Sequence, residues 1–167
     1  MLPIEKKASH DAVATERLVL PFELRCKSRL RTRLESGREV GVFLDRGTIL
    51  RGGDLLEAHD GCIVAVVAAP EEVMEVRSDN ALMLARAAYH LGNRHVAVQL
   101  KTGLLRFAKD HVLGEMVRGL GLAVVEASAA FEPESGAYGG HGGHGHSADG
   151  EGRGARIHDM MLKQRAS

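Results

Sequence analysis

The sequence predicts an α+β protein with an all-β N-terminal domain over residues 1–70, a domain of strands and helices over residues 71–133, and a tail over residues 134–167. Three observations support this division. Short strands separated by glycine turns fill the first part, strands alternate with helix-length segments in the second, and glycine and histidine dominate the third. Pro70 marks the change between the first two patterns.

A strand with a basic face is the first clear pattern in the N-terminal part. From position 25 to position 34 a basic residue occupies every second position: Arg25, Lys27, Arg29, Arg31 and Arg33. Period two indicates a strand. The turn Glu35-Ser36-Gly37 and a second strand from Val40 to Leu44 complete a hairpin, and a further strand runs from Cys62 to Ala69. The basic face is either a solvated strand face or a contact for an acidic partner.

The second domain begins with a strand from Val73 to Arg77 and a helix that Ser78 caps and Gly92 ends. Four residues of this helix fall on one face: Leu82, Ala85, Ala88 and Tyr89.

A hairpin and a second helix complete this domain. The hairpin joins strands 96–101 and 104–108 through Thr102-Gly103. Asp110 caps a helix with apolar residues at helical spacing: Val112, Leu113, Met116, Val117 and Leu120. Leu122 to Ala127 is the last strand. The order is therefore βαββαβ, the ferredoxin-like arrangement of two helices on one face of a four-stranded antiparallel sheet.

Composition excludes several classes of function. Lys plus Arg equals Asp plus Glu at 22 each, so no overall field favours nucleic acid or an anionic membrane. The longest apolar run, Ile63 to Ala69, is far shorter than the ~20 residues of a membrane span. The start of the chain lacks the apolar region of a secretory signal, so we expect a cytoplasmic protein. Cys26 and Cys62 have no CxxC spacing and are expected to be buried structural thiols.

The tail carries the clearest chemical signal. Nine of the 20 glycines lie between Gly136 and Gly154, and His141, His144 and His146 stand among them. Such a segment cannot build a core and is expected to be flexible. Glycine lets neighbouring imidazoles fold around one ion, and neutral imidazole suits Ni²⁺, Cu²⁺ and Zn²⁺. The alternative is a low-complexity tail that binds metal only adventitiously.

His95 ends the segment Gly92-Asn93-Arg94-His95 at the entrance to a strand, so we expect it near the domain surface. One histidine cannot make a specific metal site, and its local sequence also fits an ordinary exposed histidine. An enzyme is not expected, because the chain has no HExxH, no Walker lysine motif, no GxSxG and no supporting Cys/His spacing.

From roughly residue 29 to residue 146 the chain resembles the urease accessory protein UreE family, the nickel chaperones of urease maturation. Five features carry the resemblance: the basic strand RLRTRLESGREV, the segment LDRGTILRGGDLL, the helix ARAAYHLGNRH, the segment KDHVLGEMVRGLG and the His-rich C-terminus. The resemblance implies a homodimer formed through the ferredoxin-like domains, in which His95 meets its symmetry mate to share one metal. The family's GHxH-type tail matches Gly143 to His146, which implies His144 and His146 as further ligands, with His141 as an additional candidate.

The same resemblance implies the function and its partners. The protein is expected to bind Ni²⁺, with Zn²⁺ or Cu²⁺ competing, and to deliver it to the urease apoprotein together with the urease accessory GTPase. The alternative is a passive metal store whose functional element is the tail. Lys109-Asp110-His111 stands where some relatives have an HDH triplet, so an accessory copper site at His111 is not expected. Four histidines have no motif behind them: His10, His59, His90 and His158.

Overall fold

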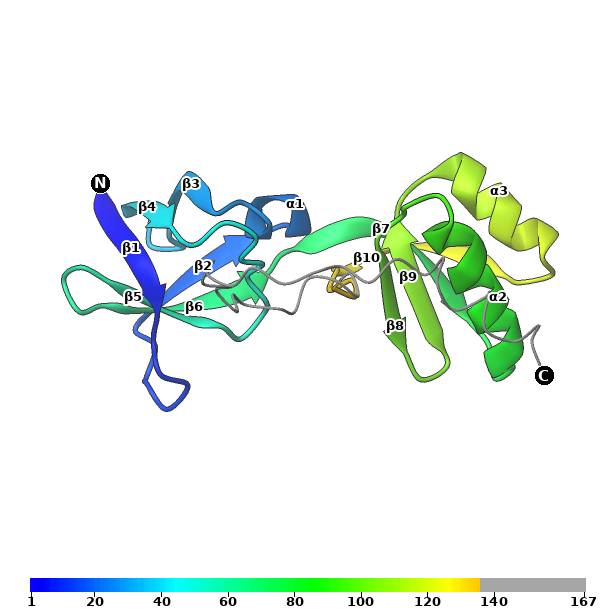
Figure 1. The fold of residues 1–167 in the computed structure, drawn as a ribbon, viewed down its shortest axis with the longest axis horizontal. Coiled ribbons are helices and arrows are strands. Elements are labelled where there is room, and N and C mark those ends of the chain that lie inside the picture. Colours follow the sequence, from blue (N-terminus) through cyan, green and yellow to red (C-terminus); the bar gives the residue numbers. More distant parts are fainter. Residues whose placement is uncertain (136–167) are drawn as a thin grey trace, which may run out of the picture. The chain divides into compact units, whose positions relative to one another are not determined.

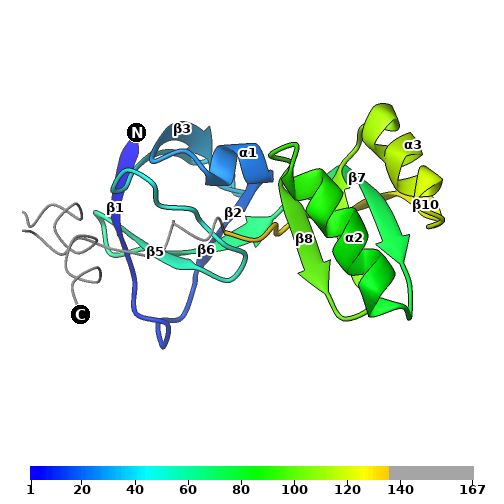
Figure 2. The same cartoon turned by 45° about the vertical axis from the view of Figure 1, so that its right-hand side comes forward.

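The structure, a computed structural model, describes residues 1–135. Figures 1 and 2 show these residues in colours that run from blue at the N-terminus to yellow-orange. The predicted ligands His141, His144 and His146 lie outside the described residues. The described residues belong to one compact unit, and their strands form two sheets.

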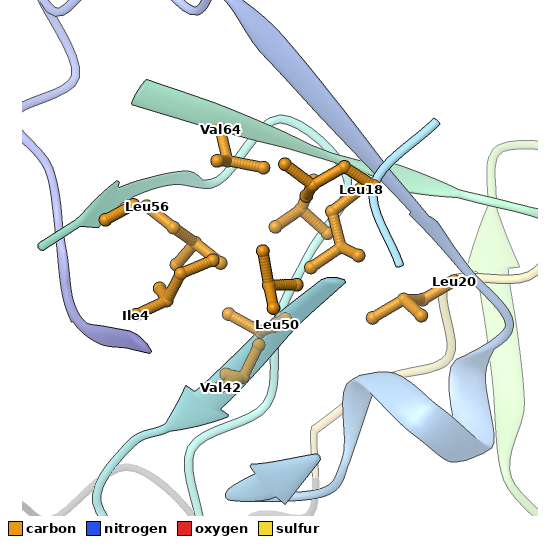
Figure 3. Packing of buried hydrophobic residues seen from close by; sticks show 11 residues of the cluster. Ile4, Leu18, Leu20, Val42, Leu50, Leu56 and Val64 are labelled. Atoms are coloured by element: carbon orange, nitrogen blue, oxygen red, sulfur yellow. The ribbon is translucent and has the colours of Figure 1, made fainter. Parts of the chain in front are cut away.

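The first sheet has six strands: β1 (Leu2–Lys7), β2 (Glu16–Leu20), β3 (Arg29–Arg33), β4 (Glu39–Phe43), β5 (Leu55–Ala58) and β6 (Ile63–Ala68). Their order is β2-β6-β5-β1-β4-β3, with β1 parallel to β4 and β2 parallel to β6. Inward-facing side chains from these strands and the loop before β5 meet in one apolar cluster, which Figure 3 shows around Ile4, Leu18, Leu50 and Leu56. The predicted hairpin is confirmed as β3 and β4, and its Gly37 has a φ of 87°. Left-handed backbone of this kind favours glycine.

Three strands of this sheet were not predicted from the sequence: β1, β2 and β5. β1 buries only Ile4 completely and contains Pro3, so its local sequence has neither strict alternation nor strand propensity. Pairing with β4 and β5 holds it in place. Pairing in the tertiary structure, rather than local strand propensity, therefore determines that these segments are strands.

The prediction that a strand begins at Arg25 is wrong. Residues Phe22–Arg25 form the short helix α1, which follows Pro21, and β3 begins only at Arg29. Arg25 is fully buried rather than part of a basic face. Its Nε donates to the carbonyl oxygen of Leu20 at 3.1 Å and its Nη1 to that of Leu50 at 3.3 Å. Backbone carbonyls therefore replace water as hydrogen-bond acceptors for the guanidinium.

The second sheet has four antiparallel strands: β7 (Pro70–Arg77), β8 (Val98–Lys101), β9 (Leu104–Ala108) and β10 (Val124–Ala130). Their order is β10-β7-β9-β8. Helix α2 (Ala81–Gly92) joins β7 to β8, and helix α3 (His111–Gly119) joins β9 to β10. Both helices lie on the same face of the sheet (Figures 1 and 2), where Leu84 and Val117 share one core with Phe107. The α+β class and the order of these elements agree with the prediction.

Both helices have side-chain caps, although one differs from the prediction. Asn80, not Ser78, caps α2, because its Oδ1 accepts from the N–H groups of Leu82 and Met83 at 3.1 and 3.2 Å. Asp110 caps α3 as predicted, accepting from Leu113 N–H at 3.0 Å. Such caps satisfy helix donors that have no intrahelical partner.

The buried faces of the helices also differ from the sequence pattern. α2 buries Leu84, Ala87 and Leu91, while Leu82 and Tyr89 are 61% and 66% exposed. In α3, Val112 is 78% exposed. Of the predicted face of α2, Leu82, Ala85 and Tyr89 are thus exposed in the single chain, while Ala88 is half-buried against the core.

The cysteine prediction is also wrong. Cys26 is exposed and Cys62 is half-buried. Cys26 directly follows the last residue of α1 and faces outward as Arg25 turns inward. Within residues 1–135 no helix is long and apolar enough to cross a membrane.

Candidate metal centre

His95 occupies a specialised backbone position just after helix α2. The N–H of His95 donates to the carbonyl of Gly92 at 2.8 Å, and the N–H of Val96 donates to that of Leu91 at 3.1 Å. This pair of bonds is the Schellman motif, in which the residue past the helix adopts left-handed backbone and is usually glycine. His95 has a φ of 57° and is the one described non-glycine residue with positive φ.

That backbone conformation has a cost. A non-glycine residue in the left-handed region loses about 1 kcal/mol or more relative to glycine. In the pattern Gly92-Asn93-Arg94-His95 the glycine stands three positions before the strained residue, so it does not relieve the strain. Two backbone hydrogen bonds fix the direction in which the exposed His95 side chain leaves the chain.

A shallow hollow of about 410 Å³ lies beside His95. Its walls come from the end of α2, from the chain leading into β8, and from Glu134 and Ser135, the last described residues. The N–H of Glu134 donates to the carbonyl of Val98 at 2.8 Å, which ties this segment to the edge strand β8. The described chain thus ends at the hollow that His95 lines.

A second, apolar hollow of about 440 Å³ lies between α2 and the β8–β9 hairpin. Ala88 and Leu100 line both hollows. Leu100 is 44% exposed. Together with Leu82, Ala85 and Tyr89, these residues make the uncovered apolar face of α2 and β8. We call this surface the α2 face.

His95 alone does not complete a coordination sphere. Within residues 1–135 no group of three or more His, Cys, Asp or Glu side chains is placed to hold a metal ion. Imidazole sites for divalent transition ions use about four or more donors. A metal site that includes His95 would therefore need donors from outside the described part of one chain.

The segment Lys109-Asp110-His111 lies at the start of α3. Lys109 Nζ contacts carboxylate oxygens of Glu126 and Glu72, and the hydrogen bond to Glu126 raises the pKa of Lys109. A protonated lysine has no lone pair for a metal. His111 is exposed, as are His10 and His59, and none of them stands in a described metal-binding group.

A partly buried ionic cluster, which no sequence pattern predicted, holds the segment after β10. Glu132 Oε1 accepts from Arg25 Nη1 and from the N–H of Gly52, each at 2.8 Å, and Glu132 Oε2 accepts from Arg51 Nη1 at 3.3 Å. Burial opposes ionisation of Glu132, but these donors outweigh it and lower its pKa. No local pattern links residues 25, 51 and 132, so only the fold brings them together.

The basic face is shorter than predicted. Arg29, Arg31 and Arg33 are exposed on β3, and Glu39 on β4 pairs with Arg31 at 3.1 Å and Arg33 at 2.7 Å. Exposed pairs of this kind contribute about 0–1 kcal/mol. The arrangement fits a solvated strand face.

Comparison with known proteins identifies relatives over most of the chain. The family described as UreE urease accessory protein, N-terminal domain, matches residues 3–69, and the corresponding C-terminal domain family matches residues 71–160. A urease accessory protein UreE of Alkalilimnicola ehrlichii is 56% identical over 140 residues, which cover 84% of this chain and 86% of the relative. One from Ralstonia nicotianae is 52% identical over 155 residues (89% and 74%), and one from Nitrosospira multiformis is 48% identical over 156 residues (92% and 89%).

Proposed function

Because this chain belongs to the urease accessory protein UreE family, we propose that it is a nickel carrier that binds Ni²⁺ through histidines and delivers it for assembly of the urease active site. The family is an accessory metallochaperone family with a role in urease maturation, not a family of enzymes. The ion is cargo here, so the site must hold it firmly and still release it.

The observation that carries the proposal is the strained position of His95 beside the end of the described chain. A non-glycine residue kept in left-handed backbone indicates a selected side chain, because glycine would be more stable there. His95 lines the hollow that Glu134 and Ser135 also line. His141 follows Ser135 by six positions, and six residues span at most about 20 Å, so the tail is long enough to return to His95. His95, His144, His146 and His141 are our proposed ligands.

A homodimer supplies the remaining donors. A two-fold axis at the site doubles each histidine, so two His95 side chains and two tails provide four or more nitrogens. The uncovered α2 face adjoins His95 and supports this assignment, since exposed apolar patches mark interaction sites. We therefore propose dimerisation through the second sheet and its helices, residues 71–133, as a ferredoxin-like domain separate from residues 1–70 and from the tail 134–167.

The proposed partners follow from the family. The carrier works in the cytoplasm with the urease accessory GTPase and the urease apoprotein. Selectivity for Ni²⁺ over Cu²⁺ comes from geometry, supply and partner, because intrinsic affinity at imidazole nitrogens is higher for Cu²⁺. Zn²⁺ competes for the same donors.

Titration calorimetry with Ni²⁺ and Zn²⁺ tests the proposal on three full-length proteins: the parent, His95→Asn, and a tail variant with His141→Ala, His144→Ala and His146→Ala. Asparagine tolerates left-handed backbone, so His95→Asn removes the imidazole with little change in the cap. We expect His95→Asn to weaken the tightest site at least about 100-fold, since a ligand is lost. His90→Asn, in the last turn of helix α2, is the matched control.

The results separate a carrier from a passive store. If His95→Asn leaves the tightest site unchanged and the tail variant abolishes binding, the protein is a tail-based store and the proposed site is wrong. The carrier mechanism requires one tight ion per dimer that depends on His95, with a further contribution from the tail.

A further inference from the structure

The segment from Phe131 to Ser135 is held from two sides. On one side, Glu132 N–H donates to Gln99 Oε1 at 3.1 Å and Glu134 N–H donates to the carbonyl of Val98 at 2.8 Å. Both acceptors are on β8, within four positions of His95. We call residues 131–135 the tail root, because the tail continues from it.

On the other side, Arg51 from the loop before β5 holds the last residues of the tail root. Its Nη1 donates to the carbonyl of Pro133 at 2.6 Å, and its Nη2 donates to Ser135 Oγ at 2.8 Å. The same guanidinium pairs with Glu132 at 3.3 Å and faces the ring of Phe22 at 5.9 Å. One planar group with several donors thus fixes three of the five residues.

Without these contacts the tail would begin at the end of β10. β10 and β8 are the two outer strands of the second sheet, separated by β7 and β9. At about 4.8 Å per strand, the starting point would move by roughly 14 Å. The tether between the last fixed residue and His144 would also lengthen. It is nine residues when Ser135 is fixed and fourteen when the last fixed residue is Ala130. The effective concentration of a tethered group falls with about the −3/2 power of tether length, which gives about twofold from length alone.

We propose that Arg51 is a positioning residue for metal binding: by holding Pro133 and Ser135 it starts the histidine tail beside His95 and so raises the local concentration of tail imidazoles at that site. This inference rests on the proposed function, because it requires His95 and the tail to share an ion. Arg51 itself contacts no metal. Its contribution is to reduce the conformational freedom that the tail loses on binding.

The test is a double-mutant cycle between Arg51 and the tail histidines in the full-length protein, measured by Ni²⁺ titration calorimetry. Arg51→Glu removes the bonds to Pro133 and Ser135 and places a carboxylate against Glu132 and the carbonyl of Pro133, which releases the end of the tail root on this side. We expect a three- to tenfold lower affinity with the native tail, and a change of less than about twofold in the His141→Ala, His144→Ala, His146→Ala background. Arg51→Lys retains the charge but not the planar fork of donors, so it should restore only part of the affinity.

Two controls make the result specific. Arg46→Glu introduces the same charge change at an exposed arginine of the loop after β4 and should not weaken binding. Hydrogen exchange of the Glu134 amide reports the tail root directly, and its protection should fall in Arg51→Glu.

Three outcomes overturn the inference: an equal loss of affinity in both tail backgrounds, no loss with the native tail, or an unchanged Glu134 amide. Each can occur while His95→Asn still abolishes the tight site, so failure of this inference is distinct from failure of the proposed function.

Discussion

The two sheets differ in the chemistry of their exposed surfaces, one charged and the other apolar. The exposed side of β3 and β4 in the first sheet carries arginines that pair with Glu39 of the same chain. The α2 face of the second sheet carries Leu82, Tyr89 and Leu100, all more than 40% exposed. A charged face is stable against water, whereas a continuous apolar face next to a hollow is stabilised by being covered. The difference favours the second sheet, not the first, as the interface of the proposed homodimer.

Two phenylalanines give the largest contrast in stability. Phe107 on β9 is fully buried, and Phe43 on β4 is 40% exposed. We expect Phe107→Ala to lower the free energy of unfolding by about 3–5 kcal/mol, because it leaves a cavity in the core of the second sheet. Phe43→Ala should cost less than about 1 kcal/mol. Urea unfolding followed by circular dichroism measures both, and similar losses would contradict the assigned core.

Two arginines give the next contrast. Arg25 is fully buried and donates to Leu20, Leu50, Phe131 and Glu132, while the side chain of Arg31 is 72% exposed. We expect Arg25→Met to cost about 2–4 kcal/mol, since it removes charge-assisted bonds and leaves Glu132 short of a partner. Arg31→Met should cost at most about 1 kcal/mol. Equal melting temperatures for the two variants would show that the cluster around Arg25 contributes nothing.

Placing a negative charge on the α2 face or on the first sheet tests which of these two surfaces is covered in the proposed dimer. Leu100→Glu puts a carboxylate into the α2 face and should raise the dimer dissociation constant at least about 100-fold, because that charge would be buried without a partner. Arg31→Glu makes a comparable change on the first sheet and should leave the dimer intact. Analytical ultracentrifugation distinguishes them, and a dimer that survives Leu100→Glu would move the interface elsewhere.

Acid stability gives the smallest contrast. Burial tends to raise the pKa of Glu75, but its bonds to Arg106 and Arg77, each 2.7 Å, outweigh burial and lower it. A lowered folded pKa contributes stability that is present above the ordinary value of about 4.3 and is lost as pH falls through the folded pKa. Glu75→Gln should therefore be less stable than the parent at pH 7, with the gap closing below about pH 4.5 at up to about 1.4 kcal/mol per pH unit.

Glu39→Gln is the comparison on the first sheet. Hydrogen bonding to Arg31 lowers the pKa of Glu39, but the group is exposed, so the gap should be smaller and should shrink in salt. Urea unfolding across pH 3–7 measures both variants, and a gap for Glu75→Gln that widens in acid would reverse the assigned sign. Metal release is separable, because imidazoles in model peptides titrate near pH 6.5, well above the carboxyl titration near pH 4.3.

Helices and strands bounded by clear turn or capping residues were predictable from the sequence, and short strands without such residues were not. The hairpin β3–β4, helix α3 with its Asp110 cap, and the order from β7 to β10 follow from local patterns. β1 and β5 do not, because long-range pairing rather than propensity stabilises them. The buried face of α2 was also missed, since apolar residues occur on both sides of that helix and periodicity cannot choose between them.

By itself the sequence determined which residues can bind metal, because the ability of an imidazole to bind a metal and the freedom of the glycines around it do not depend on the fold. It also determined that His95 follows a helix. Only the tertiary structure decided that His95 takes the left-handed cap position, that Arg25 turns inward, and that Arg51 and Glu132 hold the tail root near β8. Such contacts join residues about 80 to 107 positions apart, and no local preference encodes them; they exist because folding buries charges that must then find partners.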